Sequence, residues 1–367
     1  MKNIPVSNEF VADGVDFNQV KRVLIIKLRH HGDVLITSPM FTVLKQQFPH
    51  LDIDALVYKD TMPMLQDHPY IGELLYIDRN WKRLGLKGQI REEWKLIKHL
   101  KSRQYDVIFH MTDHWRGLTL VKLLRPPVSV TQIHPMRPGK FWKNTFTYNY
   151  PVNFKKRHMV EKHLDAFRRL GVYPTTEQKR MLVVPGQAAE ESVTAILKDA
   201  DINPGEYIHF HPTSRWLFKS WDESSVAGLI NELQSRGHKI VLTAAPDEAE
   251  MNMVRRILEK VEVPLLNLAG KVSLKELMVI IQRAKLLIGV DSVPMHIASA
   301  TNTPCLAFFG PSNELEWGPW MNRHTILSSS HSCRPCDLAG CGDGRKSECL
   351  SALTVEQALS AAELLLA

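Results

Sequence analysis

Residues 23–39 read VLIIKLRHHGDVLITSP and outline one strand–loop–helix unit of an α/β fold. The apolar run 23–28 is rich in branched side chains, which is typical of a buried parallel strand. A polar loop containing Gly32 and Asp33 follows it, and apolar residues then recur at helical spacing over 34–47. This order predicts the start of a doubly wound parallel sheet, whose ligands bind at the carboxyl ends of the strands.

The same alternation continues along the chain and then begins again near residue 207. In the first half it predicts strands at 52–58, 74–77 and 106–110 and helices over 90–103, 115–124 and 161–170. In the helix over 90–103, Ile90, Trp94, Ile97 and Leu100 share a face, as in an amphipathic helix. The second half predicts strands at 207–211, 239–244, 265–268, 286–290 and 305–309, and helices over 223–235, 248–260, 274–284 and 354–366.

A chain of 367 residues is too long for one ordinary core, which favours two α/β domains. We expect a polar N-terminal arm over 1–20, a first domain over 21–180, a second over 181–353 and a closing helix over 354–367. Residues 126–156 are irregular, and 172–187 is a plausible interdomain connection.

Composition and charge narrow the classes of function. The chain is 44% hydrophobic and 23% charged, as in ordinary globular proteins, and its net charge of +7 favours an anionic partner. No apolar signal-peptide region opens the chain and no run of about 18 apolar residues occurs, so we expect a cytosolic protein. No GxxxxGK[ST] loop is present, which disfavours P-loop enzymes, and the second half lacks the GxGxxG pattern of dehydrogenases.

Polar residues follow three of the predicted strands. Asp33 is a candidate general base or, alternatively, a plain helix N-cap. Thr213 and Ser214 could donate hydrogen bonds to a phosphate, and Lys219 could neutralise its charge. Alternatively, these residues form an ordinary polar loop. The segment from Asp291 to His296 begins a helix, whose amino end attracts anions.

Three segments together resemble the family-9 glycosyltransferases, the lipopolysaccharide heptosyltransferases. These are VLIIKLRHHGDVLITSP at 23–39, HPTSRWLFKSW at 211–221 and GVDSVPMHIASA at 289–300, with TPCLAFFGP at 303–311 in addition. The motif DSVPMH at 291–296 is most similar to that of the heptosyltransferases that add the branching third heptose. One position departs from the family, because Val293 stands where the family usually has Gly, and valine does not take a positive φ comfortably.

The resemblance implies a GT-B fold, with two Rossmann-like domains facing a central cleft, and an inverting transfer of heptose from ADP-L-glycero-D-manno-heptose. It implies Asp33 as the catalytic base and no requirement for a metal or other cofactor. Donor binding then falls to the residues that match the family motifs or their neighbourhood: Thr213, Ser214, Lys219, Glu248, Asp291, Ser292, Val293 and His296. Glu248 is also readable as a solvated residue of a first helical turn.

The acceptor implied by the resemblance is a phosphorylated glycolipid at the cytoplasmic face of the inner membrane. The basic stretch from Arg137 to Lys162 could contact its phosphates or an anionic leaflet, or could be a solvated face. We therefore expect peripheral membrane contact and acceptor binding by Arg137, Lys140, Lys155, Lys156 and Arg157, with Lys143 and Lys162 in the same stretch.

Three other functions remain open at this stage. The first is transfer of the first or second core heptose, and the second is a nucleotide-sugar epimerase of GT-B shape. The third is nucleic-acid binding through the positive charge, but no aromatic–basic recognition motif supports it, so we expect no nucleic-acid partner.

Four of the five cysteines lie close together, at Cys333, Cys336, Cys341 and Cys349. Disulfides do not suit a cytosolic chain, whereas four thiolates suit structural zinc. The spacing lacks the paired C-x2-C…C-x2-C form of a zinc ribbon, so free thiols in a compact loop are the favoured interpretation. Cys305 lies in an apolar run and is expected in the core.

Overall fold

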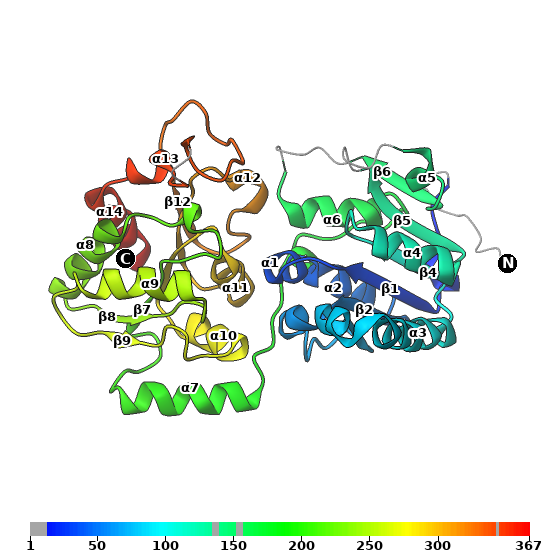
Figure 1. Cartoon of the computed structure of the whole chain (residues 1–367), viewed down its shortest axis with the longest axis horizontal. Coiled ribbons are helices and arrows are strands. Elements are labelled where there is room, and N and C mark those ends of the chain that lie inside the picture. The colour runs from blue at the N-terminus through cyan, green and yellow to red at the C-terminus, as the bar shows by residue number, and fades with distance from the viewer. Residues whose placement is uncertain (1–12, 134–138, 152–156, 343–344) are drawn as a thin grey trace. The chain divides into compact units, whose positions relative to one another are not determined.

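The computed structural model describes residues 13–133, 139–151, 157–342 and 345–367. The chain divides into two compact units, Met1–Leu182 and Val183–Ala367, which run from blue to green and from green to red in Figure 1. Each unit contains one six-stranded parallel sheet.

The sheet of the first unit has the strand order β3-β2-β1-β4-β5-β6. Every neighbouring pair is parallel, and Val23 of the central strand lies between Ile53 and Val107 of the strands beside it. The strands are β1 (Arg22–Lys27), β2 (Asp52–Tyr58), β3 (Leu74–Ile77), β4 (Val107–His110), β5 (Val128–Ile133) and β6 (Tyr148–Pro151).

Helices cover both faces of this sheet. Leu24 and Ile108 point into a cluster with side chains of α3 and α4, whereas Phe109 packs edge-on against Phe167 of α6 at 4.9 Å between ring centroids. The helices are α1 (His31–Leu35), α2 (Ser38–Gln47), α3 (Gly85–Arg103), α4 (Trp115–Leu124), α5 (Lys140–Lys143) and α6 (Met159–Arg168), with 3-10 turns η1 (Phe17–Gln19), η2 (Lys59–Met64), η3 (Arg79–Leu84) and η4 (Glu177–Lys179).

The second unit repeats the same topology with the strand order β12-β11-β10-β7-β8-β9. Its strands are β7 (Tyr207–His211), β8 (Lys239–Leu242), β9 (Leu266–Asn267), β10 (Leu286–Val290), β11 (Cys305–Phe308) and β12 (His324–Leu327). Its helices are α7 (Gln187–Asp199), α8 (Glu223–Ser235), α9 (Glu248–Leu258), α10 (Leu274–Gln282), α11 (Val293–Thr301), α12 (Glu314–Trp317), α13 (Glu348–Ser351) and α14 (Val355–Leu366), with the 3-10 turn η5 (Leu217–Lys219).

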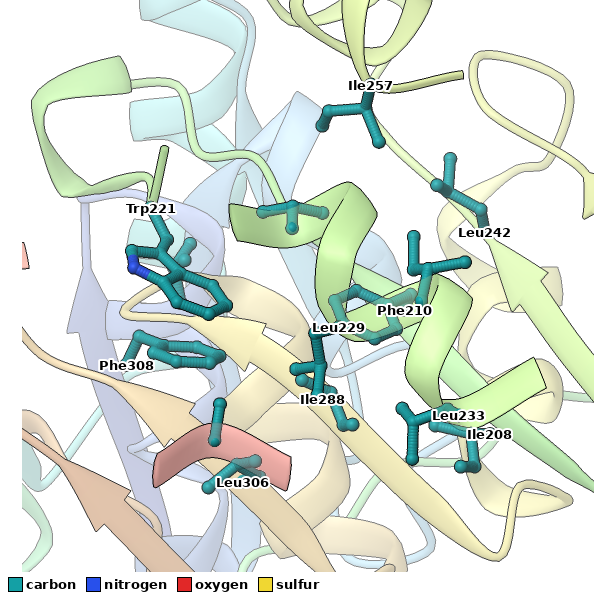
Figure 2. Packing of buried hydrophobic residues seen from close by; sticks show 14 of the residues in the cluster. Ile208, Phe210, Trp221, Leu229, Leu233, Leu242, Ile257, Ile288, Leu306 and Phe308 are labelled. Carbon is teal, nitrogen blue, oxygen red and sulfur yellow. The ribbon is translucent and has the colours of Figure 1, made fainter. Parts of the chain in front are cut away.

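The larger core of the second unit lies between this sheet and helices α8, α9 and α14 (Figure 2). The Trp221 and Phe308 rings stack at 4.6 Å, and the Trp221 indole donates to the Leu353 carbonyl at 3.2 Å. Cys305 is fully buried, as expected for a core residue. Ser273 and Thr354 each form a capping box at the start of a helix, which fixes where α10 and α14 begin.

Several regions differ from what the sequence pattern predicts. The helix expected over 34–47 is two helices, because α1 ends at Leu35 and α2 begins at Ser38 with Pro39 in its first turn. The irregular stretch 126–156 contains β5 and β6, and the connection 172–187 leads into a helix, α7, that the pattern did not reveal.

The expected polar arm over 1–20 is wrong for the part that the structure describes. Val15, Phe17 and Val20 are buried, and the Val15 amide donates to the Leu170 carbonyl at 3.0 Å. Burial of three apolar side chains attaches this segment to the first unit. In the described ranges, no helix has both the length and the apolar character needed to cross a bilayer.

Candidate functional site

In the first unit, Asp33 lies where ligands of doubly wound sheets bind. The strand order reverses between β1 and β4, and the first turn of α1, which follows β1, carries Gly32 and Asp33 at that switch point. His30, not Asp33, is the N-cap residue of α1, and Asp33 belongs to its first turn. The structure therefore excludes the interpretation of Asp33 as a plain N-cap.

A buried lysine accompanies this carboxylate. The Lys27 ammonium, at the end of β1, lies 3.7 Å from the Asp33 carboxylate, donates to the Met111 carbonyl at 3.1 Å and contacts His163 Nε2 at 3.1 Å. Burial lowers the pKa of Lys27, while the charge of Asp33 acts in the opposite direction. Burial also lowers the pKa of His163 well below its ordinary value, so the imidazole is neutral and Nε2 accepts from the ammonium.

A second ion pair borders this group. Arg29, in the loop after β1, lies 3.4 Å from Asp113 in the loop after β4. Two cations and two carboxylates, Lys27, Arg29, Asp33 and Asp113, therefore meet at the carboxyl edge of the sheet. The sequence already contained a signal for Lys27, because it is the one charged residue within the apolar run 23–28; His163, on α6, gave none.

In the second unit, the predicted donor residues gather at the equivalent switch point, between β7 and β10. Lys219, in η5, and Asp291, directly after β10, form an ion pair of 2.6 Å although 72 residues separate them. Asp291 is buried and the lysine is mostly buried, so solvent screens this pair weakly. The ammonium has two further N–H groups with which to bind an anion.

The two hydroxyl residues after β7 are both buried. The Thr213 hydroxyl donates to Glu250 of α9 at 2.6 Å, and the Ser214 hydroxyl accepts from the Trp216 amide at 3.2 Å. Burial raises the pKa of Glu250. Glu248, the predicted ribose ligand, is exposed at the start of the same helix. The carboxylate that contacts the loop after β7 is thus Glu250. The sequence did not single it out, because α9 contains two acidic residues two positions apart.

The motif after β10 forms a helix N-terminus. Ser292 is the N-cap of α11, and its hydroxyl donates to the Val290 carbonyl at 3.4 Å. Val293 is the first helical residue and is not among the residues with positive φ, so the departure from glycine creates no backbone conflict. His296 is buried one turn further along.

Two buried histidines of β7 precede the loop that carries Thr213 and Ser214. Thr243, directly after β8, has its hydroxyl 2.6 Å from His209 Nε2 and 2.8 Å from His211 Nδ1. Burial lowers the pKa of His211 to about 4, so this histidine is neutral at neutral pH. The loop that begins at Pro212 therefore starts from a fixed, uncharged network.

The basic stretch is only partly described. Arg137, Lys155 and Lys156 lie outside the described residues, whereas Lys140 and Lys143 are exposed on α5. Arg157 pairs with Asp165 at 2.7 Å and with Glu161 at 3.4 Å, and Lys162 is buried. Two carboxylates, rather than Glu161 alone, therefore offset the charge of this stretch.

The cysteine-rich loop contains no disulfide in its described part. Cys333 is exposed, Cys336 and Cys341 are half-buried and Cys349 is buried, with its pKa raised by burial. Within the described ranges, which omit residues 343–344 of this loop, no three His, Cys, Asp or Glu side chains are placed to hold a metal ion. Structural zinc stays a hypothesis for metal analysis.

Comparisons with known proteins match this architecture. A family model described as glycosyltransferase family 9 (heptosyltransferase) matches residues 93–345. Lipopolysaccharide heptosyltransferase 3 of Escherichia coli is 36% identical over 296 residues, which make up 80% of this chain and 85% of that relative.

Solved structures of this family share the fold. A family-9 glycosyl transferase from Veillonella parvula aligns with a TM-score of 0.81 at 23% identity and covers 94% of this chain and 97% of that one. Escherichia coli ADP-heptose lipopolysaccharide heptosyltransferase II aligns with a TM-score of 0.73 at 20% identity, covering 94% and 98%. The two doubly wound units are therefore those of a GT-B fold.

Proposed function

This chain belongs to glycosyltransferase family 9, and we propose on that premise that it transfers a heptose from ADP-L-glycero-D-manno-heptose to the inner core of lipopolysaccharide. The acceptor position that we propose is heptose II, which receives the branching third heptose. Support for the acceptor comes from the 36% identity with a heptosyltransferase 3, and support for the donor from the ADP-heptose enzyme of the same fold.

One observation of the structure carries the proposal of a nucleotide-sugar donor: the Lys219–Asp291 ion pair at the switch point of the second sheet. We assign Lys219 to the diphosphate, whose negative charge increases as the glycosidic bond breaks. Asp291 holds the ammonium in place. The amino end of α11, with Ser292, Val293 and His296, adds further positive potential through the dipole of the helix.

The remaining donor contacts are assigned to the loop after β7. Thr213 and Ser214 provide hydroxyl groups beside the diphosphate, and Glu250 fixes Thr213 through their 2.6 Å hydrogen bond. Because Glu250 is buried and Glu248 is exposed, we place Glu250 inside the donor site and assign Glu248 to contacts at its rim.

Asp33 is the proposed base. The acceptor hydroxyl loses its proton to the Asp33 carboxylate while its oxygen attacks the anomeric carbon. The bond between that carbon and the diphosphate oxygen breaks, and ADP leaves with the bonding electron pair. Attack opposite to the leaving group inverts the anomeric configuration. Lys27, whose ammonium lies 3.7 Å from the Asp33 carboxylate, positions that carboxylate.

The acceptor is a phosphorylated glycolipid in this proposal, so the enzyme works at the cytoplasmic face of the inner membrane as a peripheral protein. Lys140 is exposed and could reach acceptor phosphates. Arg137, Lys155 and Lys156 lie outside the described residues and stay candidates from the sequence alone. Arg157 is a weaker candidate, because Asp165 and Glu161 already pair with its guanidinium.

Acceptor-dependent release of ADP tests the proposal. ADP-heptose is supplied with core acceptors that end before heptose I, at heptose I or at heptose II. We expect release with the acceptor that carries heptose II and background release with the shorter ones. Release with a shorter acceptor would assign the enzyme to the first or second heptose, and conversion of the nucleotide sugar without any acceptor would indicate an epimerase.

A further inference from the structure

The first half of α3 presents an apolar stripe to solvent. Leu86, Ile90 and Trp94 recur at intervals of four residues, so they lie on one face of the helix, and they are 76%, 58% and 62% exposed. Leu84, directly before the helix, is also exposed. We call these four residues the α3 surface.

The amphipathic pattern of this helix predicted a face directed into the core, and the structure follows it only in the second half. Leu96 and Ile97 pack partly against the core, and Leu100 is the one buried residue in all of α3, each of whose residues is described. The same apolar face therefore has two functions along its length: the end near Leu100 holds the helix on the sheet, and the beginning faces outward.

Basic residues surround the α3 surface. Lys87, Arg91 and Lys95 form a second stripe, one position on from the apolar one, and all three are exposed. Between residues 81 and 98 there are six basic residues and two acidic ones, Glu92 and Glu93. Glu92 pairs with Lys95 and Arg91, and Glu93 pairs with Arg116 of α4, but four positive charges remain in excess.

Two further exposed aromatic residues lie together on α4 and α5. Trp115, the first residue of α4, and Phe141 of α5 have ring centroids 6.1 Å apart, and the Lys122 ammonium lies 3.8 Å from the Phe141 ring centroid. The ion pair between Arg116 and Glu93 joins the start of α4 to α3. Aromatic side chains among cations are the composition of protein surfaces that enter the headgroup layer of a bilayer.

This surface and Asp33 occupy the same edge of the sheet. The turn η3 follows the carboxyl end of β3 and leads into α3. Arg79 of η3 donates to the carbonyl of Arg29 at 3.4 Å, and Arg29 lies in the short loop that leads into α1, the helix of Asp33. A lipid bilayer against the α3 surface would thus lie on the side of the first unit where the proposed base is found.

We propose that the α3 surface docks this enzyme on an anionic phospholipid bilayer. Leu84, Leu86, Ile90 and Trp94 enter the headgroup layer, and the basic stripe contacts the lipid phosphates. The inference rests on the proposed function only for its purpose, which is to bring the base to a lipid-anchored acceptor. Binding to lipid follows from the surface alone.

The excess of positive charge favours an anionic bilayer over a second copy of the chain as the partner of the α3 surface. A second copy of the chain would place like-charged stripes against one another, which is unfavourable in an isologous contact. An anionic leaflet attracts juxtaposed Lys and Arg side chains at about 1 kcal/mol each, and this attraction weakens with salt.

Vesicle flotation tests the proposal on the full-length enzyme. Wild type is compared with Ile90→Glu/Trp94→Glu on vesicles of phosphatidylethanolamine with phosphatidylglycerol and on vesicles of phosphatidylcholine alone. Leu364→Glu, at a position of α14 that is 71% exposed, is the matched control for adding a charge at an exposed apolar residue. Thermal unfolding verifies that each variant is folded.

We expect the double variant to lose at least about tenfold in affinity for the anionic vesicles, and the control to bind like wild type. Wild-type binding should weaken in high salt and on phosphatidylcholine. Equal binding by the double variant and wild type overturns the proposal. So does a wild-type dimer, by light scattering, that the double variant converts to monomer.

The activity measurements separate this proposal from the proposed function. With a delipidated, soluble core acceptor the double variant should turn over like wild type, and with the acceptor in vesicles it should be slower. If wild type binds vesicles through this surface but transfers no heptose, the proposed function fails and the docking surface stands. If the double variant and wild type transfer heptose equally well in vesicles and bind the vesicles equally, only the docking surface fails.

Discussion

Replacing Lys27 with methionine removes the ammonium beside Asp33 while keeping most of the volume of the buried side chain. Two unit charges 3.7 Å apart attract by about 1 kcal/mol at the dielectric constant of water and by about 4.5 kcal/mol at an effective value of 20. Asp33 is 19% exposed, so solvent screens part of this interaction. We therefore expect the substitution to remove about 1 to 3 kcal/mol of stabilisation, which corresponds to roughly a 5- to 150-fold loss of rate.

The assay is acceptor-dependent ADP release, with kcat and the acceptor KM measured separately. Without the ammonium that holds the carboxylate in place, Lys27→Met should lose kcat by this factor while its affinity for ADP stays unchanged. His163→Gln is the matched control, because its amide oxygen still accepts from Lys27 and the pair with Asp33 is retained; its kcat should stay close to that of wild type. A folded Lys27→Met enzyme with the kcat of wild type would refute the assigned role.

Four further predictions follow from the same sites. Asp33→Ala should reduce turnover by about 10²–10⁴-fold with unchanged ADP affinity by calorimetry, and near-normal turnover would remove it as the base. Lys219→Ala should weaken ADP binding by about 10- to 100-fold, since hydrogen bonds to charged groups contribute about 1.5–3 kcal/mol, and unchanged affinity together with an unchanged rate would exclude it from the site. Burial lowers the pKa of both His211 and His68, whose ring packs against Phe41 of α2, to about 4. Because the unfolded chain binds protons already near pH 6.5, the stability from these neutral histidines is complete above that pH and decreases toward pH 4, by up to about 1.4 kcal/mol per pH unit for each. Denaturant titrations with no such slope would contradict this prediction. Metal analysis of protein purified under reducing conditions should find less than stoichiometric zinc, with Cys333, Cys336 and Cys341 titrating as thiols; one tightly held zinc per chain would show that the loop closes around a metal.

Much of the fold was predictable because parallel strands and amphipathic helices leave strong local patterns. The strands Leu74–Ile77, Tyr207–His211 and Leu286–Val290 lie where the apolar runs predict them, and Ser273 and Thr354 cap the predicted helices. The strand Tyr148–Pro151 was missed because it lies at the sheet edge and carries Asn and Pro, which disfavour strands.

Long-range contacts explain what the pattern could not reveal in the sites. The sequence singled out both Lys219 and Asp291, but their ion pair across 72 residues depends on β7 and β10 being neighbours in the sheet. The sequence did not distinguish Glu250 from Glu248, because the rotation of α9 about its axis decides which of the two carboxylates is buried. Likewise, Ile90 and Trp94 have the spacing of a packed face, but the structure leaves both of them exposed.

Linkage analysis of the purified product tests the central claim most directly. ADP-heptose and a core acceptor that ends at heptose II are converted by the wild-type enzyme, and NMR locates the added sugar and its anomeric configuration. We predict one new heptose, attached as a branch to heptose II, with the configuration inverted relative to the donor and one ADP released for each heptose added. A heptose attached to another residue, retention of configuration, or ADP released without a glycosidic product would contradict the account.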